Sequence, residues 1–213
     1  MPFDPFKDFE KSGYLRNLLG SQDMEVIRDL ENIQFQTNLR PALNQLQAVF
    51  SLDYKHVLMT HKTLFGDLYP LWAGKDRRMT SPHLNISKNG YERMFCDSND
   101  IEKVVRQALK QGQDYDYMQA HPSEIMGLLA HAHPFLDGNG RTIMLIHADL
   151  CDRAEISIDW EKINKQDYLK VLTKEIYLPG QGHLDNYLRP FIGEAKGISI
   201  GNLGNLLDRK PFG

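Results

Sequence analysis

The chain has 213 residues and a formal net charge of −3, with 25 Lys and Arg side chains against 28 Asp and Glu. This length predicts one domain, or one domain with a small lobe, and allows a sizeable core without disulfides. The charge balance excludes nonspecific binding to nucleic acid as a default function, so direct nucleic-acid binding is not expected.

Cysteine content and hydropathy indicate a reducing compartment and no membrane contact. Cys96 and Cys151 are too few for a disulfide framework, although one bridge between them stays open. The first residues lack the basic and apolar regions of a signal peptide, and no apolar run approaches the roughly 18 residues of a membrane helix. We therefore expect a cytoplasmic protein, with export by a route that needs no N-terminal signal as the alternative.

The first third of the chain shows helical periodicity behind a short arm. Residues 1–13 contain two prolines and end in glycine, and they are predicted to form an N-terminal arm. A short helix is predicted over 14–19. Apolar residues then recur at helical spacing over 24–50, where Pro41 is predicted to split or kink the helix, and again over 53–68.

The chain changes character between residues 76 and 95, where proline, glycine and asparagine accumulate. Apolar and polar residues alternate there, which is the one convincing strand signal in the sequence. The pattern predicts a small hairpin of Pro82–Ser87 against Tyr91–Phe95, with its turn at Lys88-Asn89-Gly90. We call this predicted hairpin, residues 82–95, the flap.

The second half of the chain is again typical of helices. Apolar residues at helical spacing predict five of them, over 101–111, 123–133, 141–154, 160–176 and 184–195. The third is apolar nearly all round, as a central core helix should be. We therefore expect an all-α domain over 14–195 with one hairpin, a core at about 53–154, and a flexible tail over 196–213.

A dense group of polar and glycine residues, from His133 to Arg141, lies between the second and third of these five helices. Pro134 disfavours the α conformation at His133, so the preceding helix should end there. The C-terminus of a helix raises the basicity of an imidazole. A base beside an anion site can take a proton from an incoming hydroxyl, and His133 is therefore the candidate catalytic residue.

The residues that follow suit the binding of phosphate groups. Asp137 is a candidate ligand of Mg²⁺, which accompanies nucleotide phosphates. Gly138, Asn139 and Gly140 allow successive backbone N–H groups to converge on an anion at the start of a helix. Arg141 can bind phosphate oxygens in a fork. Together these residues predict transfer of a phosphate-containing group to a hydroxyl.

The stretch from His133 to Arg141 resembles the signature of the Fic family, His-x-Phe-x-Asp/Glu-Gly-Asn-Gly-Arg-x-x-Arg. The segment over 61–77 is similar to the helix and aromatic corner that precede the family's active site. The segment over 84–90 resembles the family's flap, and that over 156–172 resembles the part after its core helix. The resemblance covers residues 14 to about 192, and its central motif is highly specific.

Resemblance to this family implies an α-helical Fic fold and transfer of AMP from ATP, with Mg²⁺, to a Ser, Thr or Tyr hydroxyl of a target protein. The resemblance implies that His133 is the general base, that Asp137 binds Mg²⁺ and that Arg141 binds the phosphates of the leaving group. It also implies that the α- and β-phosphates are held by Gly138, Asn139 and Gly140.

The flap has two implied roles. Its residues Asn85, Ile86 and Lys88 would clamp the backbone of the target protein by strand addition. The same residues would line part of the nucleotide pocket.

The family's internal inhibitory helix has no clear counterpart in this sequence. The nearest match is Ile27–Asn32, which begins with isoleucine in place of serine or threonine. The motif arginine that Glu31 would pair with is absent. We interpret the segment as an ordinary amphipathic helix and expect a separate antitoxin, as in the small, toxin-like members of the family.

The family's last arginine falls on Met144, three residues after Arg141 and on the same face of a helix. A thioether cannot pair with a γ-phosphate, and three explanations stay open. The donor differs, for example UTP or CDP-choline, since some members transfer UMP, phosphocholine or phosphate. A neighbouring cation takes over, with Arg77, Arg78 and Lys88 as candidates. The chain is a weak enzyme, or a Fic-like binding module that performs no chemistry.

A zinc hydrolase is the alternative from a different class. A metal cluster could include His131, His133, His147, Asp137 and Asp149, but the spacing of these residues matches no zinc motif. We therefore expect His131 to be a packing residue and His147 to be a buried, hydrogen-bonded histidine.

Overall fold

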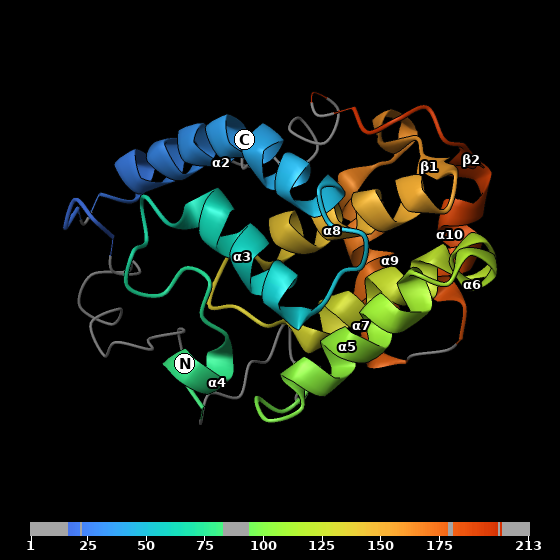
Figure 1. Ribbon diagram of the computed structural model, residues 1–213, viewed down its shortest axis with the longest axis horizontal. Helices are drawn as coiled ribbons and strands as arrows, with labels where there is room; N and C mark the ends of the chain where they lie inside the picture. Colours follow the sequence, from blue (N-terminus) through green and yellow to red (C-terminus); the bar gives the residue numbers. More distant parts are fainter. Residues whose placement is uncertain (1–16, 22, 83–93, 179–180, 200, 202–213) are drawn as a thin grey trace.

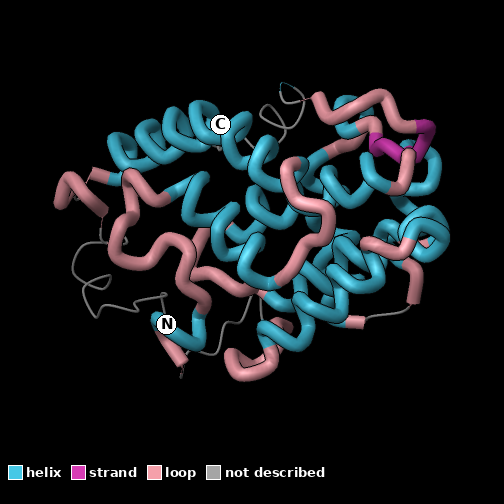
Figure 2. The backbone as a smooth tube through the Cα atoms, in the orientation of Figure 1, coloured by secondary structure: helices cyan, strands magenta, loops and turns pink. Residues whose placement is uncertain are grey.

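The computed structural model describes residues 17–21, 23–82, 94–178, 181–199 and 201. Within these ranges the chain is mainly helical, as the sequence predicts, and one pair of short strands lies at one end of the molecule (Figure 2). The predicted arm, most of the tail and nearly all of the flap, with Asn85, Ile86 and Lys88, lie outside the described residues.

The first long helix, α2 (Met24–Gln47), begins at Asp23, whose carboxylate accepts hydrogen bonds from the first backbone N–H groups of the helix. The split predicted at Pro41 does not occur, and α2 continues through it. A proline removes one backbone hydrogen bond from a helix, but here the surrounding turns are fixed by burial. The buried residues of this stretch are Phe35, Leu39, Ala42, Leu43 and Leu46.

A short connection leads from α2 into α3 (Tyr54–Phe65), which packs against it (Figure 1). A capping box at Asp53 and His56 starts α3. Beyond α3 an irregular aromatic segment leads to a single helical turn, α4 (Arg77–Thr80), which the sequence did not predict. The side chains of α3 that face the core include Val57, His61, Leu64 and Phe65.

The remaining helices follow the predicted order with one addition. They are α5 (Ile101–Gly112), α6 (Tyr115–Ala120), α7 (Pro122–Ala132), α8 (Asn139–Arg153), α9 (Lys165–Tyr177) and α10 (His183–Leu188). The short α6 was not predicted. Helix α8 lies at the centre of the molecule and contacts α2, α3 and α7 (Figure 1). Every residue from Arg141 to His147 is buried, which confirms the predicted core helix.

The two strands, β1 (Ile156–Ile158) and β2 (Ile192–Glu194), form an antiparallel pair in which Ser157 lies opposite Gly193. The helix predicted over 184–195 is therefore too long. It ends at Leu188. Pro190 has no backbone N–H to continue the helical hydrogen bonds, and the chain passes through a 3₁₀ turn into β2.

Two further features concern the state of the cysteines and the length of the helices. Cys96 and Cys151 are free, so the bridge that the sequence left open does not form. Burial raises the pKa of the Cys96 thiol to about 11, and it raises that of the Cys151 thiol further. In the described parts of the chain, every helix is too short or too polar to cross a membrane.

Candidate active site

The candidate base lies at the end of α7. Helix α7 stops at Ala132, and His133 is its C-cap, as predicted, with φ 40° and ψ 58°. This left-handed conformation is rare for a residue with a side chain. The half-buried imidazole stacks on Phe95, with ring centroids 3.9 Å apart and an interplanar angle of 26°. The ring of His133 is therefore held in one plane at a strained backbone position.

The loop after His133 is braced by Asn139. The Asn139 side-chain oxygen accepts the N–H of Phe135 at 2.8 Å, and its amide group donates to the Phe135 carbonyl at 2.7 Å. Both residues are buried. The side chain of Asn139 thus closes the loop on itself, and only its backbone N–H remains for a phosphate.

His61 of α3 supports the same loop, a role that the sequence analysis missed. The Gly74 N–H donates to Nδ1 of His61 at 2.9 Å, so the ring proton is on Nε2, which donates to the Asp137 carbonyl at 3.0 Å. The ring also stacks on Phe135 at 3.8 Å between centroids. Burial lowers the pKa of His61 to about 3, so this ring is neutral at physiological pH.

Two buried histidines make the stability depend on pH. Burial lowers the pKa of His147 to about 4, and its Nε2–H donates to the Pro122 carbonyl at 2.7 Å. In the unfolded chain both histidines have a pKa of about 6.5, so they bind protons as the pH falls below that value. In the folded protein the two rings stay neutral to lower pH, because burial lowers the pKa of His61 to about 3 and that of His147 to about 4. The contribution of the two neutral rings to the free energy of unfolding is therefore fully present above pH 6.5, and it is lost as the pH drops towards 4.

We expect the free energy of unfolding to be roughly 3–4 kcal/mol lower at pH 5 than at pH 7, with about equal shares from the two rings. Urea titrations at the two pH values measure it. In His147→Gln the difference between the two values should shrink by about half, because one of the two linked protons is lost. Equal stability of the wild type at pH 5 and pH 7 would contradict this account of the two rings.

Asp137 suits a metal that arrives with a nucleotide. It is half-buried, and one oxygen of its carboxylate accepts the Gly138 N–H at 2.6 Å. In the described ranges no three His, Cys, Asp or Glu side chains gather as a metal cage. Mg²⁺ is usually held by one or two carboxylates together with substrate phosphates. A single carboxylate two residues before a helix N-terminus therefore fits Mg²⁺ but does not fit a structural zinc.

The N-terminus of α8 is open to an anion. Gly138 is the N-cap with φ 74°, and no side chain caps the helix. The first N–H groups, those of Asn139, Gly140 and Arg141, have no intrahelical acceptor, and the helix dipole adds positive potential. Gly140 is exposed, and a Cβ built on it would meet nothing within 4 Å. Space therefore remains for a phosphate in front of these donors.

Replacing Gly138 by alanine tests the geometry of this turn. A Cβ on Gly138 would lie 2.6 Å from Cε2 of Phe65, in addition to the strain at φ +74°. We expect Gly138→Ala to lower the free energy of unfolding by about 2–3 kcal/mol. Gly182→Ala is the matched control, because φ is +67° there and the added Cβ would meet nothing within 4 Å. Equal losses in the two variants would mean that Phe65 does not press on the turn.

The side chain of Arg141, which the sequence predicts to bind phosphate, is buried and paired with a carboxylate in this structure. Its side chain is 6% exposed, and its Nη2 forms an ion pair with Glu31 of α2, which is 3% exposed. The Tyr69 hydroxyl donates to the other oxygen of Glu31 at 2.6 Å. The guanidinium also lies 4.5 Å from the ring centroid of Phe65. The sequence indicates an ordinary amphipathic helix around Glu31 and offers no motif arginine for it, so this pair was not predicted.

Two of the three cations considered as substitutes at Met144, Arg77 and Arg78, lie in the described residues. Met144 is 4% exposed and belongs to the hydrophobic core. Arg77 is 1% exposed, and its guanidinium donates to backbone carbonyls, so it is not a substitute phosphate ligand. The Nη2 of Arg78 lies 3.8 Å from Asp76 and 3.6 Å from Glu102. Lys88 lies outside the described residues.

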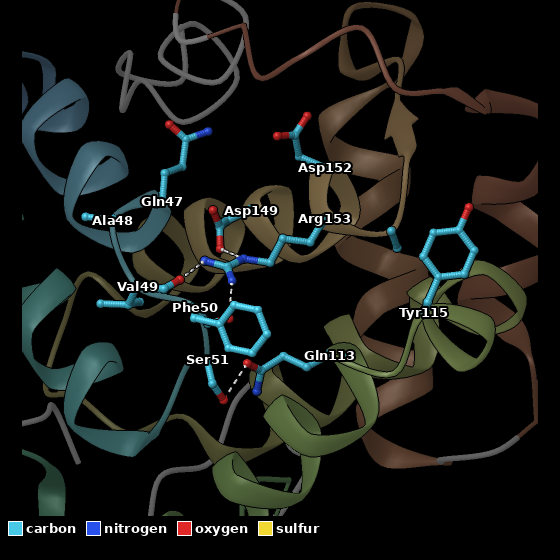
Figure 3. Close-up of a pocket in the computed structure, with 12 residues that line it drawn as sticks. Gln47, Ala48, Val49, Phe50, Ser51, Gln113, Tyr115, Asp149, Asp152 and Arg153 are labelled. Carbon is cyan, nitrogen blue, oxygen red and sulfur yellow. Dashed lines mark hydrogen bonds and ion pairs between the residues drawn. The ribbon is translucent and has the colours of Figure 1, made fainter.

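A cavity of about 670 Å³ lies at the far end of α8, roughly 20 Å along the helix from Asn139 (Figure 3). Arg153 is the one cation among the described residues that line it. Its guanidinium is occupied, because Nε donates to Asp149 at 2.7 Å and the Nη atoms donate to carbonyls at the end of α2 and beyond. The cavity therefore offers a phosphate no comparable site.

Comparison with known proteins confirms the resemblance. Residues 51–151 match the model of the Fic/DOC family. The protein adenylyltransferase VbhT of Bartonella schoenbuchensis is 29% identical over 176 residues, which span 82% of this chain and 36% of VbhT. The probable protein adenylyltransferase y4lH of Sinorhizobium fredii is 25% identical over 170 residues, 75% of this chain and 82% of that protein. The chain is therefore similar to members of the Fic/DOC family, and it spans about a third of VbhT.

Solved structures agree with the fold. BepC, a VirB-translocated effector of Bartonella tribocorum with bound AMPPNP, has a TM-score of 0.69 at 19% identity, over 87% of this chain and 95% of that one. The Fic domain of a Bartonella quintana effector with bound ADP has a TM-score of 0.70 at 20% identity, over 88% of this chain and 94% of that one. At these identities the likeness establishes the fold alone.

Proposed function

We propose that the chain is a protein adenylyltransferase, which transfers AMP from ATP to a Ser, Thr or Tyr hydroxyl of a target protein. The observation that carries the proposal is the juxtaposition of His133, in a left-handed C-cap at the end of α7, with the uncapped N-terminus of α8 six residues later. A base next to an anion site is what deprotonation of a hydroxyl and transfer of a phosphoryl group require.

In the proposed reaction, the imidazole of His133 takes the proton of the target hydroxyl. The hydroxyl oxygen then bonds to the α-phosphorus, and the bond from that phosphorus to the bridging oxygen breaks, so that pyrophosphate leaves. The backbone N–H groups of Asn139, Gly140 and Arg141 would hold the phosphates at the helix N-terminus. Mg²⁺ bound at Asp137 would supply positive charge to the phosphates.

The names of two relatives and the ligand of a similar solved structure support a nucleotide donor. VbhT and y4lH are both named adenylyltransferases, and the BepC structure holds AMPPNP. The departure at Met144 removes one cation from the distal end of the donor. Arg141 is the motif cation that remains, and it would reach phosphate only if its pair with Glu31 opens or its other nitrogens turn towards the loop. UTP or CDP-choline therefore stays as the alternative donor.

The test is transfer of label from donor to protein. The wild type and His133→Ala are incubated with Mg²⁺, a cell lysate and, in separate reactions, labelled ATP, UTP, CTP, GTP or CDP-choline. We expect a labelled band with ATP that is lost in His133→Ala, while both proteins unfold at the same urea concentration. A labelled band that forms with another donor but not with ATP would mean that the transferred group comes from that donor and is not AMP. Silence of the wild type with every donor would favour a binding module without chemistry.

We also propose partners for this activity. The flap, residues 82–95, would clamp the target backbone as an added strand, and a separate antitoxin would hold the enzyme inactive. Neither partner needs a membrane or nucleic acid. Purification of the chain from its native cells with crosslinking, followed by mass spectrometry, would recover the antitoxin in proportion to the chain and would recover the target at lower yield.

A further inference from the structure

A buried arginine lies directly behind the candidate base. Arg77 is the first residue of α4, and it is 1% exposed. Its Nε donates to the His133 carbonyl at 2.7 Å, and its Nη2 donates to the Ala132 carbonyl at 3.3 Å and the Cys96 carbonyl at 3.0 Å. Its backbone N–H donates to the Pro134 carbonyl at 2.7 Å. One residue thus contacts three consecutive residues around the base.

These contacts lie where the backbone is strained. A left-handed conformation is unfavourable at a residue with a side chain, and it persists only where the surroundings fix it. The last carbonyls of a helix carry partial negative charge and have no intrahelical partner. The guanidinium of Arg77 supplies donors to the carbonyls of both Ala132 and His133. It therefore stabilises the left-handed conformation of His133.

Phe95 fixes the ring itself. It stacks on the His133 imidazole at 3.9 Å between centroids. The segment that carries Phe95 is tied to the last turn of α7, because the Cys96 N–H donates to the His131 carbonyl at 3.0 Å and Nδ1 of His131 lies 3.0 Å from the Met94 carbonyl. The guanidinium of Arg77 closes this arrangement by holding the Cys96 carbonyl.

We propose that Arg77 and Phe95 are positioning residues for the His133 imidazole: Arg77 fixes its backbone, and Phe95 fixes the plane of its ring. The inference rests on the proposed function, in which this imidazole is the base. A displacement of about 1 Å in a catalytic group can lower turnover roughly 100-fold. The loss should therefore appear in kcat, while the KM for the donor, which is bound at α8, stays unchanged.

The kinetic test uses Phe95→Leu, Phe95→Tyr and Arg77→Lys. Leucine keeps apolar bulk without a flat ring, and a lysine ammonium cannot span three carbonyls as a fork does. We expect kcat to fall 10–100-fold in Phe95→Leu and Arg77→Lys with unchanged KM for the donor, and to recover in Phe95→Tyr. The matched control is Arg153→Lys, because Arg153 also binds three carbonyls at a helix end, far from His133. It should lose stability and keep kcat.

A second readout needs no catalysis. A stacked ring shifts the C–H protons of His133 upfield in the NMR spectrum, and comparison with His133→Ala assigns them. We expect this shift to vanish in Phe95→Leu and to change in Arg77→Lys, while it stays unchanged in Arg153→Lys. If the His133 resonance does not move, or kcat is unchanged in an active enzyme, the inference is wrong. If the wild type transfers nothing but the resonance moves as described, the proposed function fails and the positioning of the ring stands.

Discussion

Arg141→Met is expected to lower the free energy of unfolding by about 3–5 kcal/mol, because it leaves the Glu31 carboxylate buried without its ion-pair partner. Both side chains are almost fully buried, at 6% and 3% exposure, so water cannot replace the lost contact. Phe65 and Phe35, whose ring centroids lie 4.5 and 5.5 Å from the guanidinium, would also lose the cation over their rings. Urea unfolding at pH 7 measures the loss.

A double-mutant cycle separates the pair from the loss of packing. Arg141→Met combined with Glu31→Leu removes both charges and should be clearly more stable than the sum of the two single losses predicts. Recovery should stay incomplete, because the Tyr69 hydroxyl loses its acceptor on Glu31. Glu31→Gln is the matched mild variant, since the amide oxygen still accepts from Arg141 and the amide N–H can donate to the Tyr69 oxygen. Additive losses across the cycle would mean that the two side chains do not interact in solution.

Arg153→Met is expected to lower the free energy of unfolding by about 3–5 kcal/mol. Arg153 joins the C-terminal end of α8 to the end of α2 and the connection to α3, because its nitrogens donate to Asp149 and to the carbonyls of Leu46, Val49 and Phe50. Asp149 is 1% exposed and would lose its cation. Burial raises the pKa of Asp149, so the carboxyl would take up a proton in the variant, and the loss should shrink as the pH is lowered.

A surface arginine provides the control for this variant. Arg106 pairs with Asp53 and with Glu102, but its side chain is half exposed. Exposed ion pairs contribute little, since water and salt screen them. We expect Arg106→Met to leave the urea midpoint nearly unchanged. Similar losses in Arg153→Met and Arg106→Met would show that the contacts of Arg153 at the end of α8 stabilise the fold no more than a surface ion pair does.

The sequence predicted the helices and the motif because both are local signals. Apolar residues every three or four positions predicted α8 as a core helix, and the proline after His133 predicted the end of α7. The split predicted as one outcome at Pro41 does not form, because tertiary packing of α2 overrides the loss of one hydrogen bond. The strand pair was missed because β1 and β2 are short and lie far apart in the sequence, so neither shows a period of its own.

The contacts that support the site could not be predicted, because they join residues far apart in the chain. Glu31 lies 110 positions before Arg141, and its burial follows only from the packing of α2 against α8. His61 and Arg77 act on backbone carbonyls, 76 positions away at Asp137 and 56 at His133, and backbone acceptors leave no trace in the sequence. A histidine in the apolar stripe of α3 was the one available signal for His61.

The central claim is that a nucleotide binds at the N-terminus of α8 beside His133, and amide chemical shifts test it most directly. The ¹⁵N-labelled chain is titrated with ATP and Mg²⁺, and the backbone N–H resonances are followed. The account predicts that the largest shifts belong to Asn139, Gly140 and Arg141. Larger shifts at Gln113 and Asp152, which line the cavity at the far end of α8, or no shift with any nucleotide donor, would contradict it.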